Sequence, residues 1–182
     1  MDSEECIICQ LVDGKIPTKD IYEDDDVLVV LDFNGANLGH SFVIPKEHYP
    51  ILEKLPNHLV AKLFNVANKV SSAIFETIGC SGTNIFVANG IPAGQRIAHF
   101  MIHVIPRSQN DGINLGWKPK QLNEEEMSTI ELKLKEEIDK LGFGSSGTEK
   151  QSQSIKETQK TNFISSLGDE EDYFTKQLRR IP

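Results

Sequence analysis

Apolar residues gather in short runs along residues 1–118, and turn-forming residues separate the runs, which predicts one domain in this part of the chain. The runs Val27–Leu31 and Ser41–Ile44 are rich in β-branched residues, so both predict strands. The segment 34–39 between them is dominated by Asn and Gly, which is typical of a loop. The pattern therefore begins with two strands joined by a loop.

A longer periodicity follows over residues 57–78. Apolar side chains recur there every three or four positions, which predicts a helix with one buried face that ends before Gly79. Two more apolar runs, 84–88 and 99–105, predict strands. We expect the second of them to stop at Pro106, because proline donates no hydrogen bond to a strand ladder. The predicted helix face consists of Leu59, Leu63, Ala67, Val70, Ile74 and Ile78.

The remainder of the chain differs in composition. Residues 119–142 predict a C-terminal helix that begins at the cap Asn123 and ends at Gly142, with acidic residues in its first turn where the helix dipole favours them. Residues 143–162 are rich in Ser, Gln, Thr and Lys, which predicts a linker. Residues 163–182 are apolar enough to dock on the body or on a second subunit. The stripe expected to be buried on the helix is Met127, Ile130, Leu134, Ile138 and Leu141.

Charge and composition restrict the classes of function. The 182-residue chain carries 19 basic and 27 acidic side chains, a formal net charge of −8 at pH 7. This balance argues against a general nucleic-acid-binding protein, although it leaves room for a small basic pocket. No apolar run is long enough to predict a membrane span, and the acidic residues 1–5 do not resemble a secretory signal. Because three cysteines do not suggest a disulfide framework, we expect a cytoplasmic protein that does not act at a membrane.

The predicted strand 99–105 carries the first candidates for chemistry. Side chains alternate along a strand, so His99, Met101 and His103 are expected on one face. Three interpretations fit this triplet: two histidines on a half-exposed sheet, the lining of a ligand site, or a soft-metal site, since thioether and imidazole ligands suit copper. The spacing does not choose between them.

A second group of candidates lies closer to the N-terminus. Cys6 and Cys9 form a lone Cys-x-x-Cys pair, which binds zinc, acts in redox chemistry, or is simply two small buried residues. His40 and His48 lie at the two ends of the second predicted strand. Asp32 ends the preceding strand, where a carboxylate binds ligand hydroxyls or, more commonly, caps a turn.

Several separated motifs, in this order, resemble the histidine triad (HIT) proteins, and in particular their bacterial and archaeal zinc-containing branch. The resemblance covers residues 4–118 and leaves residues 143–182 outside it. The motifs are Cys6-x-x-Cys9, Gly14-Lys15-Ile16-Pro17, Tyr22-Glu23-Asp24-Asp25, Gly39-His40 with Val43-Ile44-Pro45-Lys46-x-His48, Gly94-Gln95, His99-x-x-x-His103-Val104-Ile105-Pro106-Arg107, and Trp117 after Asn110-Asp111-Gly112-Ile113-Asn114.

The resemblance implies an α+β fold, in which a five-stranded antiparallel sheet carries one long and one or two shorter helices, and a homodimer whose sheets join. It also implies a site for a small-molecule ligand, expected to be a purine nucleotide, and hydrolysis or transfer of nucleoside phosphates. By position, Asp32 would hold the ribose hydroxyls, while His103 would bind phosphate oxygens with His40 beside it. Asn89 and Gln95 would help to hold the phosphate and the leaving group. The implied ligands of a structural zinc ion are Cys6, Cys9, His48 and His99.

The sequence departs from the family pattern at Met101, which occupies the place of the middle histidine, the family's nucleophile. A thioether has no proton to lose and forms no stable phosphoryl intermediate, so the covalent route is closed. Arg96 is a second departure, because the family often has Ser or Thr there; a guanidinium would instead clamp an anion. Met101 fits a natural binding module, a natural enzyme on another substrate, or a deliberate change that traps a ligand.

Two functions therefore compete. The first is nucleotide binding with weak or no hydrolysis of the family type. The second is a diverged hydrolase that acts on another small molecule through a water nucleophile, with His103 and His40 as general acid and base.

Overall fold

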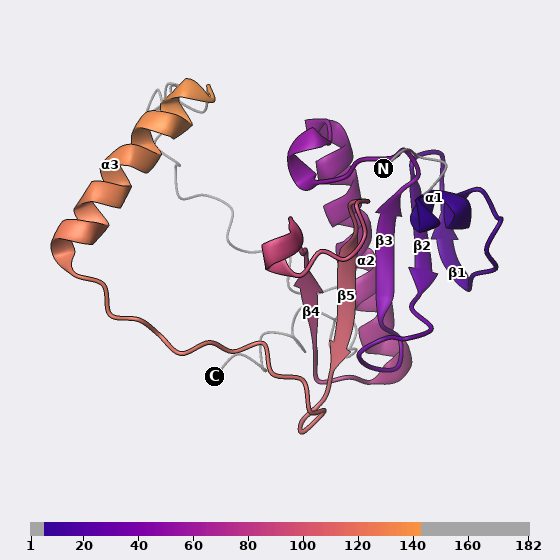
Figure 1. The fold of residues 1–182 in the computed structure, drawn as a ribbon. Coiled ribbons are helices and arrows are strands. Elements are labelled where there is room, and N and C mark those ends of the chain that lie inside the picture. The colour runs from indigo at the N-terminus through magenta and orange to yellow at the C-terminus, as the bar shows by residue number, and fades with distance from the viewer. Residues whose placement is uncertain (1–5, 143–182) are drawn as a thin grey trace, which may run out of the picture. The chain divides into compact units, whose positions relative to one another are not determined.

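The computed structural model describes residues 6–142, and the chain divides into two units, Met1–Asn114 and Leu115–Pro182. The expected linker over 143–162 and the docking segment over 163–182 lie outside the described residues. The main elements, labelled in Figure 1, are α1 (Ile7–Val12), β1 (Asp20–Glu23), β2 (Val27–Leu31), β3 (Ser41–Pro45), α2 (Asn57–Ile78), β4 (Gly82–Phe86), β5 (Ile102–Arg107) and α3 (Glu124–Lys140), with short 3₁₀ turns at Leu52–Lys54 and Ile91–Ala93.

The strands of the first unit form one five-stranded antiparallel sheet in the order β1-β2-β3-β5-β4 (Figure 1). This α+β architecture confirms the expected fold class. β5 lies between β3 and β4, so that His103 pairs in register with Phe42 on one side and with Phe86 on the other. The topology therefore brings the start of β3, which follows His40, beside the middle of β5.

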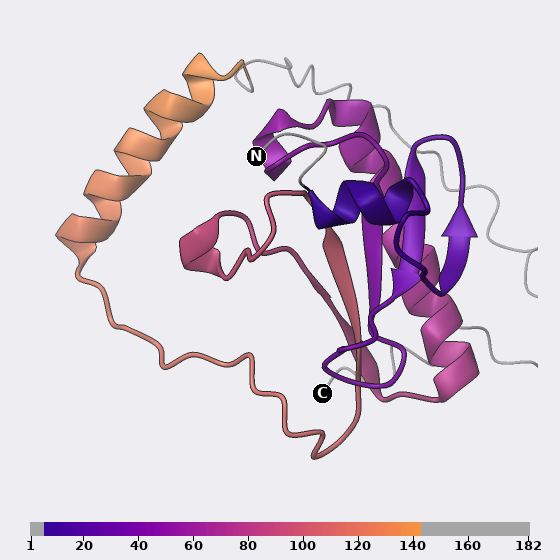
Figure 2. The same ribbon diagram turned by 45° about the vertical axis from the view of Figure 1, so that its right-hand side comes forward.

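Helices pack on both faces of the sheet, with α2 on one face and the short α1 on the other (Figure 2). On the α1 side, Leu28 and Val30 of β2 pack against Ile8. Val27 and Val29, which alternate with them, are fully buried on the opposite side. Since β2 is buried on both faces, its sequence is one continuous apolar run instead of an alternating pattern.

Helix α2 has the bounds that its apolar period predicts. It ends at Gly79, whose φ of 68° lies in the left-handed region and whose N–H donates to the carbonyl of Phe75. The expected core face is buried as far as Ile74, whereas Ile78 in the last turn is 39% exposed.

The expectation that Pro106 ends the last strand is wrong. β5 begins at Ile102 and continues to Arg107, and Pro106 pairs with Thr83 of β4. The pairing of β5 with β3 extends only as far as Val104. Because no strand pairs with β5 on its β3 side beyond that point, the missing proline N–H disrupts no ladder there.

The second unit contains α3, which begins at Asn123 as expected. The Asn123 side chain accepts a hydrogen bond from the Glu126 N–H at 2.8 Å, and the Glu126 carboxylate accepts one from the Asn123 N–H, which completes a capping box. The expected burial of the apolar stripe is wrong for the described residues, since Met127, Ile130 and Leu134 are each more than half exposed. Across residues 6–142, no helix has the length and apolarity needed to span a membrane.

Candidate functional site

Two histidines, one from β5 and one from the loop before β3, meet on the sheet face opposite α2. His40 immediately precedes β3 and His103 lies within β5, and their Nε2 and Nδ1 atoms are 3.1 Å apart. Phe42 and Phe86 flank the His103 ring, with ring centroids 4.9 and 5.8 Å away. The cross-strand register of β3, β5 and β4 places all these rings on one face.

The backbone of the loop before β3 determines where the protons of this pair lie. The Ala36 N–H donates to Nδ1 of His40 at 3.0 Å, so that Nδ1 is the unprotonated nitrogen. In the neutral ring Nε2 then carries the proton and donates it to Nδ1 of His103. His103 must in turn be protonated at Nε2. The pair therefore presents an N–H donor at Nε2 of His103.

Both rings are neutral at physiological pH. Burial lowers the pKa of His40, and the nearby Asp32 carboxylate only partly offsets that effect. Burial and the neighbouring His40 lower the pKa of His103 to about 4. The donor at His103 is therefore an imidazole N–H and not an imidazolium.

Asp32 combines the two roles that the sequence left open. One carboxylate oxygen accepts the Asn34 N–H at 2.8 Å, which caps the turn. The other lies 3.5 Å from Nδ1 of His40. The side chain is 19% exposed, so it borders both the histidine pair and solvent.

The structure does not bring His99, Met101 and His103 together as one triplet. His103 contacts His40, whereas His99 is fully buried beside the two N-terminal cysteines. Met101 is half-buried and packs against the apolar cluster that includes Leu28 and Ile44. Of the described residues, only one group offers three or more clustered His, Cys or carboxylate ligands, and it includes His99 but not His103.

The other expected ligand residues follow β4. The Asn89 amide donates to Glu53 at 2.8 and 2.9 Å, and its oxygen accepts the Leu52 N–H. Gln95 donates to two backbone carbonyls and accepts the Gly90 N–H. In this structure the two amides tie loop 89–97 to the segment before α2. Arg96 is exposed and has no hydrogen bond or ion pair with any described residue.

A second, deeply buried centre consists of four side chains whose ligand atoms all lie within 4.8 Å of one another. Nδ1 of His99 is 3.6 Å from each of the two sulfurs, and Nδ1 of His48 is 3.2 Å from Sγ of Cys9. Ligands bound to one tetrahedral zinc ion, at about 2.0–2.3 Å from it, stand about 3.3–3.8 Å apart. The four residues are Cys6, Cys9, His48 and His99.

The surroundings of this centre prepare it for a cation. Nε2 of His99 donates to the carbonyl of Pro45 at 2.9 Å, so Nδ1 keeps its lone pair and faces the sulfurs. Burial and the adjacent Cys6 raise the pKa of the Cys9 thiol to about 11. A bound cation would reverse this shift and hold both sulfurs as thiolates. The donor set and its outer hydrogen bond fit a structural Cys2His2 zinc site.

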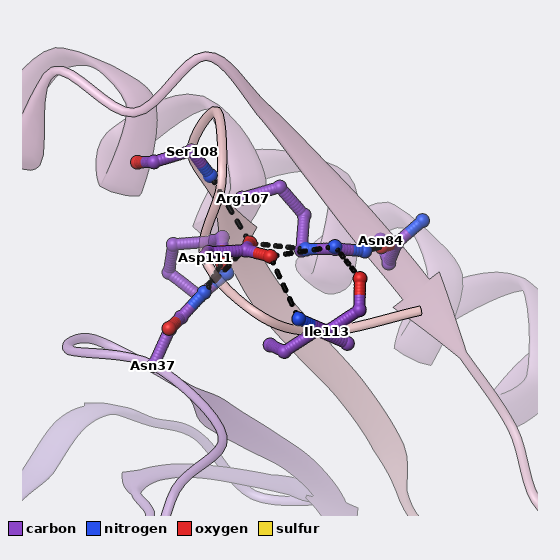
Figure 3. A network of polar contacts seen from close by, with 7 residues as sticks. Asn37, Asn84, Arg107, Ser108, Asp111 and Ile113 are labelled. Carbon is purple, nitrogen blue, oxygen red and sulfur yellow. Dashed lines mark hydrogen bonds and ion pairs between the residues drawn. The ribbon is translucent and has the colours of Figure 1, made fainter. Parts of the chain in front are cut away.

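Sequence reasoning assigned no role to a polar network beside the histidine pair (Figure 3). Asp111, in the turn after β5, accepts hydrogen bonds from Arg107 and from Asn37 in the loop before His40. Asn110, at φ 64°, and the Gly that follows Asp111 form the turn. The sequence indicates that turn, but not its contact with a loop 74 positions away.

Residues 13–110 match the family model of the HIT domain. The chain is 42% identical over 107 residues to adenylylsulfatase HINT3 of Arabidopsis thaliana, a match that covers 59% of this chain and 54% of that protein. It is 32% identical over 126 residues to adenosine 5′-monophosphoramidase hnt1 of Schizosaccharomyces pombe, a match that covers 69% of this chain and 92% of that protein. The chain thus spans only about half of the Arabidopsis relative.

Solved structures resemble the chain as well. A HIT family member from Bacillus subtilis superimposes with a TM-score of 0.69 and 32% identity, covering 72% of this chain and 96% of that one. A zinc-bound histidine triad family protein from Mycobacterium smegmatis has a TM-score of 0.59 and 30% identity, and the match covers 77% of this chain and 99% of that one.

Proposed function

The chain belongs to the histidine triad (HIT) family, and on that premise we propose that it binds a small nucleotide through its phosphate at the His40–His103 pair, without covalent turnover of the family type. The observation that supports this proposal is the N–H donor that the pair presents at Nε2 of His103. Phosphate oxygens are acceptors, and a donor directed at an anion makes a stronger hydrogen bond than one directed at a neutral group. Asp32, beside His40, would accept from the ribose hydroxyls.

Met101 occupies the position of the family's nucleophile. Its thioether packs in the apolar cluster on the α1 side of the sheet and offers no group that forms a phosphoryl bond. Removal of the nucleophile costs about 10⁶-fold in kcat in another hydrolase. Binding does not need this group, because the hydrogen-bond donor belongs to a different side chain. Arg96, exposed and without an ion pair to any described residue, supplies a cation for the ligand phosphate.

The second candidate is a diverged hydrolase that uses water as its nucleophile. The neutral pair offers a leaving group a hydrogen bond through Nε2–H of His103 but no proton, because loss of the one N–H of either neutral ring would leave an imidazolate anion. Nε2 of His103 is also no general base, because a nitrogen that already carries a proton does not accept one from water. We therefore place binding first.

The buried Cys2His2 group holds a structural zinc ion in this proposal, and the ion would tie α1 to the segments around His48 and His99. We also propose a homodimer. β4 is an edge strand of the sheet, and its Ile85 and Phe86 are 44% and 39% exposed, which suits pairing with a second copy.

Calorimetric titration of the full chain with AMP tests the ligand. We expect saturable binding that His103→Phe weakens by about tenfold or more, because a hydrogen bond to an anion is lost while the ring volume is kept. His58→Asn is the matched control, since His58 is exposed on the first turn of α2. Equal affinity for the wild-type chain and His103→Phe, or no binding by the wild-type chain, would overturn the assignment.

A further inference from the structure

The network around Asp111 has a consequence for the histidine pair. We propose that Asn37 and Asp111 are positioning residues: they hold the loop before β3 so that the Ala36 N–H stays on Nδ1 of His40, and this keeps the proton on Nε2 of His103. The effect on ligand binding rests on the proposed function. The position of the proton does not, since it is a property of the free protein.

Asp111 is the centre of the network, and its side chain is only 8% exposed. Its carboxylate accepts from Nε and Nη2 of Arg107 at 2.6 and 2.9 Å, and from the backbone N–H groups of Ile113 and Ser108 at 3.0 and 3.2 Å. These donors hold the pKa of Asp111 well below its usual range. The carboxylate is thus a fixed acceptor at the end of β5.

Asn37 connects this acceptor to the loop that carries His40 (Figure 3). Its amide nitrogen donates to Asp111 at 3.0 Å and to the carbonyl of Pro106 at 2.8 Å, so both amide hydrogens are used. Its own backbone carbonyl accepts the His40 N–H at 3.0 Å. The loop is therefore held against β5 one residue after Ala36, whose N–H reaches the His40 ring.

Little space is left for the loop to rearrange while this anchor holds. A Cβ at Gly35 would lie 2.7 Å from the Cβ of His40, so the backbone passes directly over the base of that ring. The other end is fixed as well, because the Asp32 N–H donates to the His40 carbonyl at 2.8 Å. Asn37 is the side chain that closes this loop onto the rest of the sheet.

Two groups compete for Nδ1 of His40, and they favour opposite tautomers. The Ala36 N–H, at 3.0 Å, requires an unprotonated Nδ1. The Asp32 carboxylate, at 3.5 Å, would favour a protonated one. If the loop moved and Asp32 accepted a hydrogen bond from a protonated Nδ1 of His40, Nε2 of His40 would become an acceptor. His103 would then change to the tautomer that carries its proton on Nδ1 and donates it to His40. Nε2 of His103 would then present a lone pair, which repels a phosphate oxygen.

The control for this proposal lies at the far end of the sheet. Asp24, in the turn between β1 and β2, has a comparable set of partners: two backbone N–H groups at 2.9 Å, the Tyr22 hydroxyl at 2.7 Å and Lys62 at 3.0 Å. These donors likewise hold its pKa well below the usual range. Asp24→Asn therefore weakens a turn of similar construction that does not contact His40.

The experiment is a long-range ¹H–¹⁵N correlation spectrum of the histidine rings in the full chain, without ligand, at neutral pH. We expect His103 to be protonated at Nε2 in the wild-type chain and in Asp24→Asn. In Asn37→Ala we expect the signals of His40 and His103 to move together toward the other tautomer, with AMP affinity reduced by about three- to tenfold. Asp111→Asn, which keeps the side-chain shape, should move them in the same direction by less.

Unchanged tautomers in both Asn37→Ala and Asp111→Asn would overturn the proposal, as would an equal shift in Asp24→Asn. If Asn37→Ala does not fold, Asp111→Asn and Asp24→Asn decide the question by the same comparison. A tautomer shift in a protein that does not bind AMP would support the positioning role and refute the proposed ligand, so the two failures are distinct.

Discussion

His99 and His103 are four positions apart in the sequence, yet the protein prepares them for opposite charges. The Pro45 carbonyl accepts a hydrogen bond from Nε2–H of His99, so the lone pair on Nδ1 faces the two sulfurs. This arrangement suits a cation. His40 donates to Nδ1 of His103, which leaves an N–H on Nε2, an arrangement for an anion. The group on the far nitrogen therefore decides what each imidazole can bind.

The two centres also differ in burial. His99 is fully buried and its cluster includes Cys6, which is equally buried, so this centre fits a structural role. His103 is only partly buried, beside the half-exposed Phe86 and the partly exposed Asp32, so a ligand can reach it. Two changes would break this contrast, one at each centre.

Loss of a sulfur ligand should have the largest effect. We expect Cys9→Ser to lose the proposed zinc ion and to lower Tm by about 10 °C or more, because the remaining ligands no longer hold α1 against the sheet. Metal analysis and thermal unfolding of the purified chain measure both. Cys80→Ser, at a buried cysteine outside the cluster, should keep about one zinc per chain. Equal metal content in Cys9→Ser and Cys80→Ser would refute the Cys2His2 zinc site.

Lowering the pH should destabilise the chain through the His40–His103 pair, and by less than the loss of a sulfur ligand. The pKa of His103 is lowered from 6.5 to about 4 on folding, so between these values the unfolded chain binds more protons than the native one. Stability is therefore lost as pH falls from about 6.5 to about 4. After allowance for the partial exposure of the ring, we expect a loss of about 1–2 kcal/mol. Denaturant titrations across this range measure it.

His103→Phe should reduce this pH dependence without abolishing it, because it removes one of the groups that titrate here, while burial also lowers the pKa of His40 and that of His99. Asp24 and Asp111 do not blur the comparison, since their pKa values are lowered and their contributions are lost only below about pH 4. The same slope in the wild-type chain and in His103→Phe would show that the His103 ring is not held neutral by burial.

The sequence predicts the elements that depend on long apolar periods. The bounds of α2 follow from its apolar period and from Gly79, and those of β2 from an unbroken apolar run. An apolar pattern does not predict β1, because its four residues are all exposed and its pairing with β2 shifts register after Asp20. The stripe on α3 has the helical period, but a period does not reveal whether a partner covers it.

The chemistry of the sites was less predictable for a physical reason. Resemblance to a family indicated which histidines matter, but the tautomers depend on two backbone groups, the Ala36 N–H and the Pro45 carbonyl. Backbone groups are present at every position, so residue identity does not reveal which of them faces an imidazole. The Asn37–Asp111 contact was missed because the sequence shows two separate turns and not their meeting.

The most direct test of the account is product formation from adenosine 5′-phosphoramidate by the wild-type chain and by Met101→His, with Met101→Leu as a control for the change in packing. We predict turnover by Met101→His at a rate at least about a hundredfold above that of the other two chains, because the donor at His103 is present and only the nucleophile is missing. Equal turnover by the wild-type chain and Met101→His would contradict the account, and no turnover by any of the three would contradict the assignment of the pair as a phosphate site.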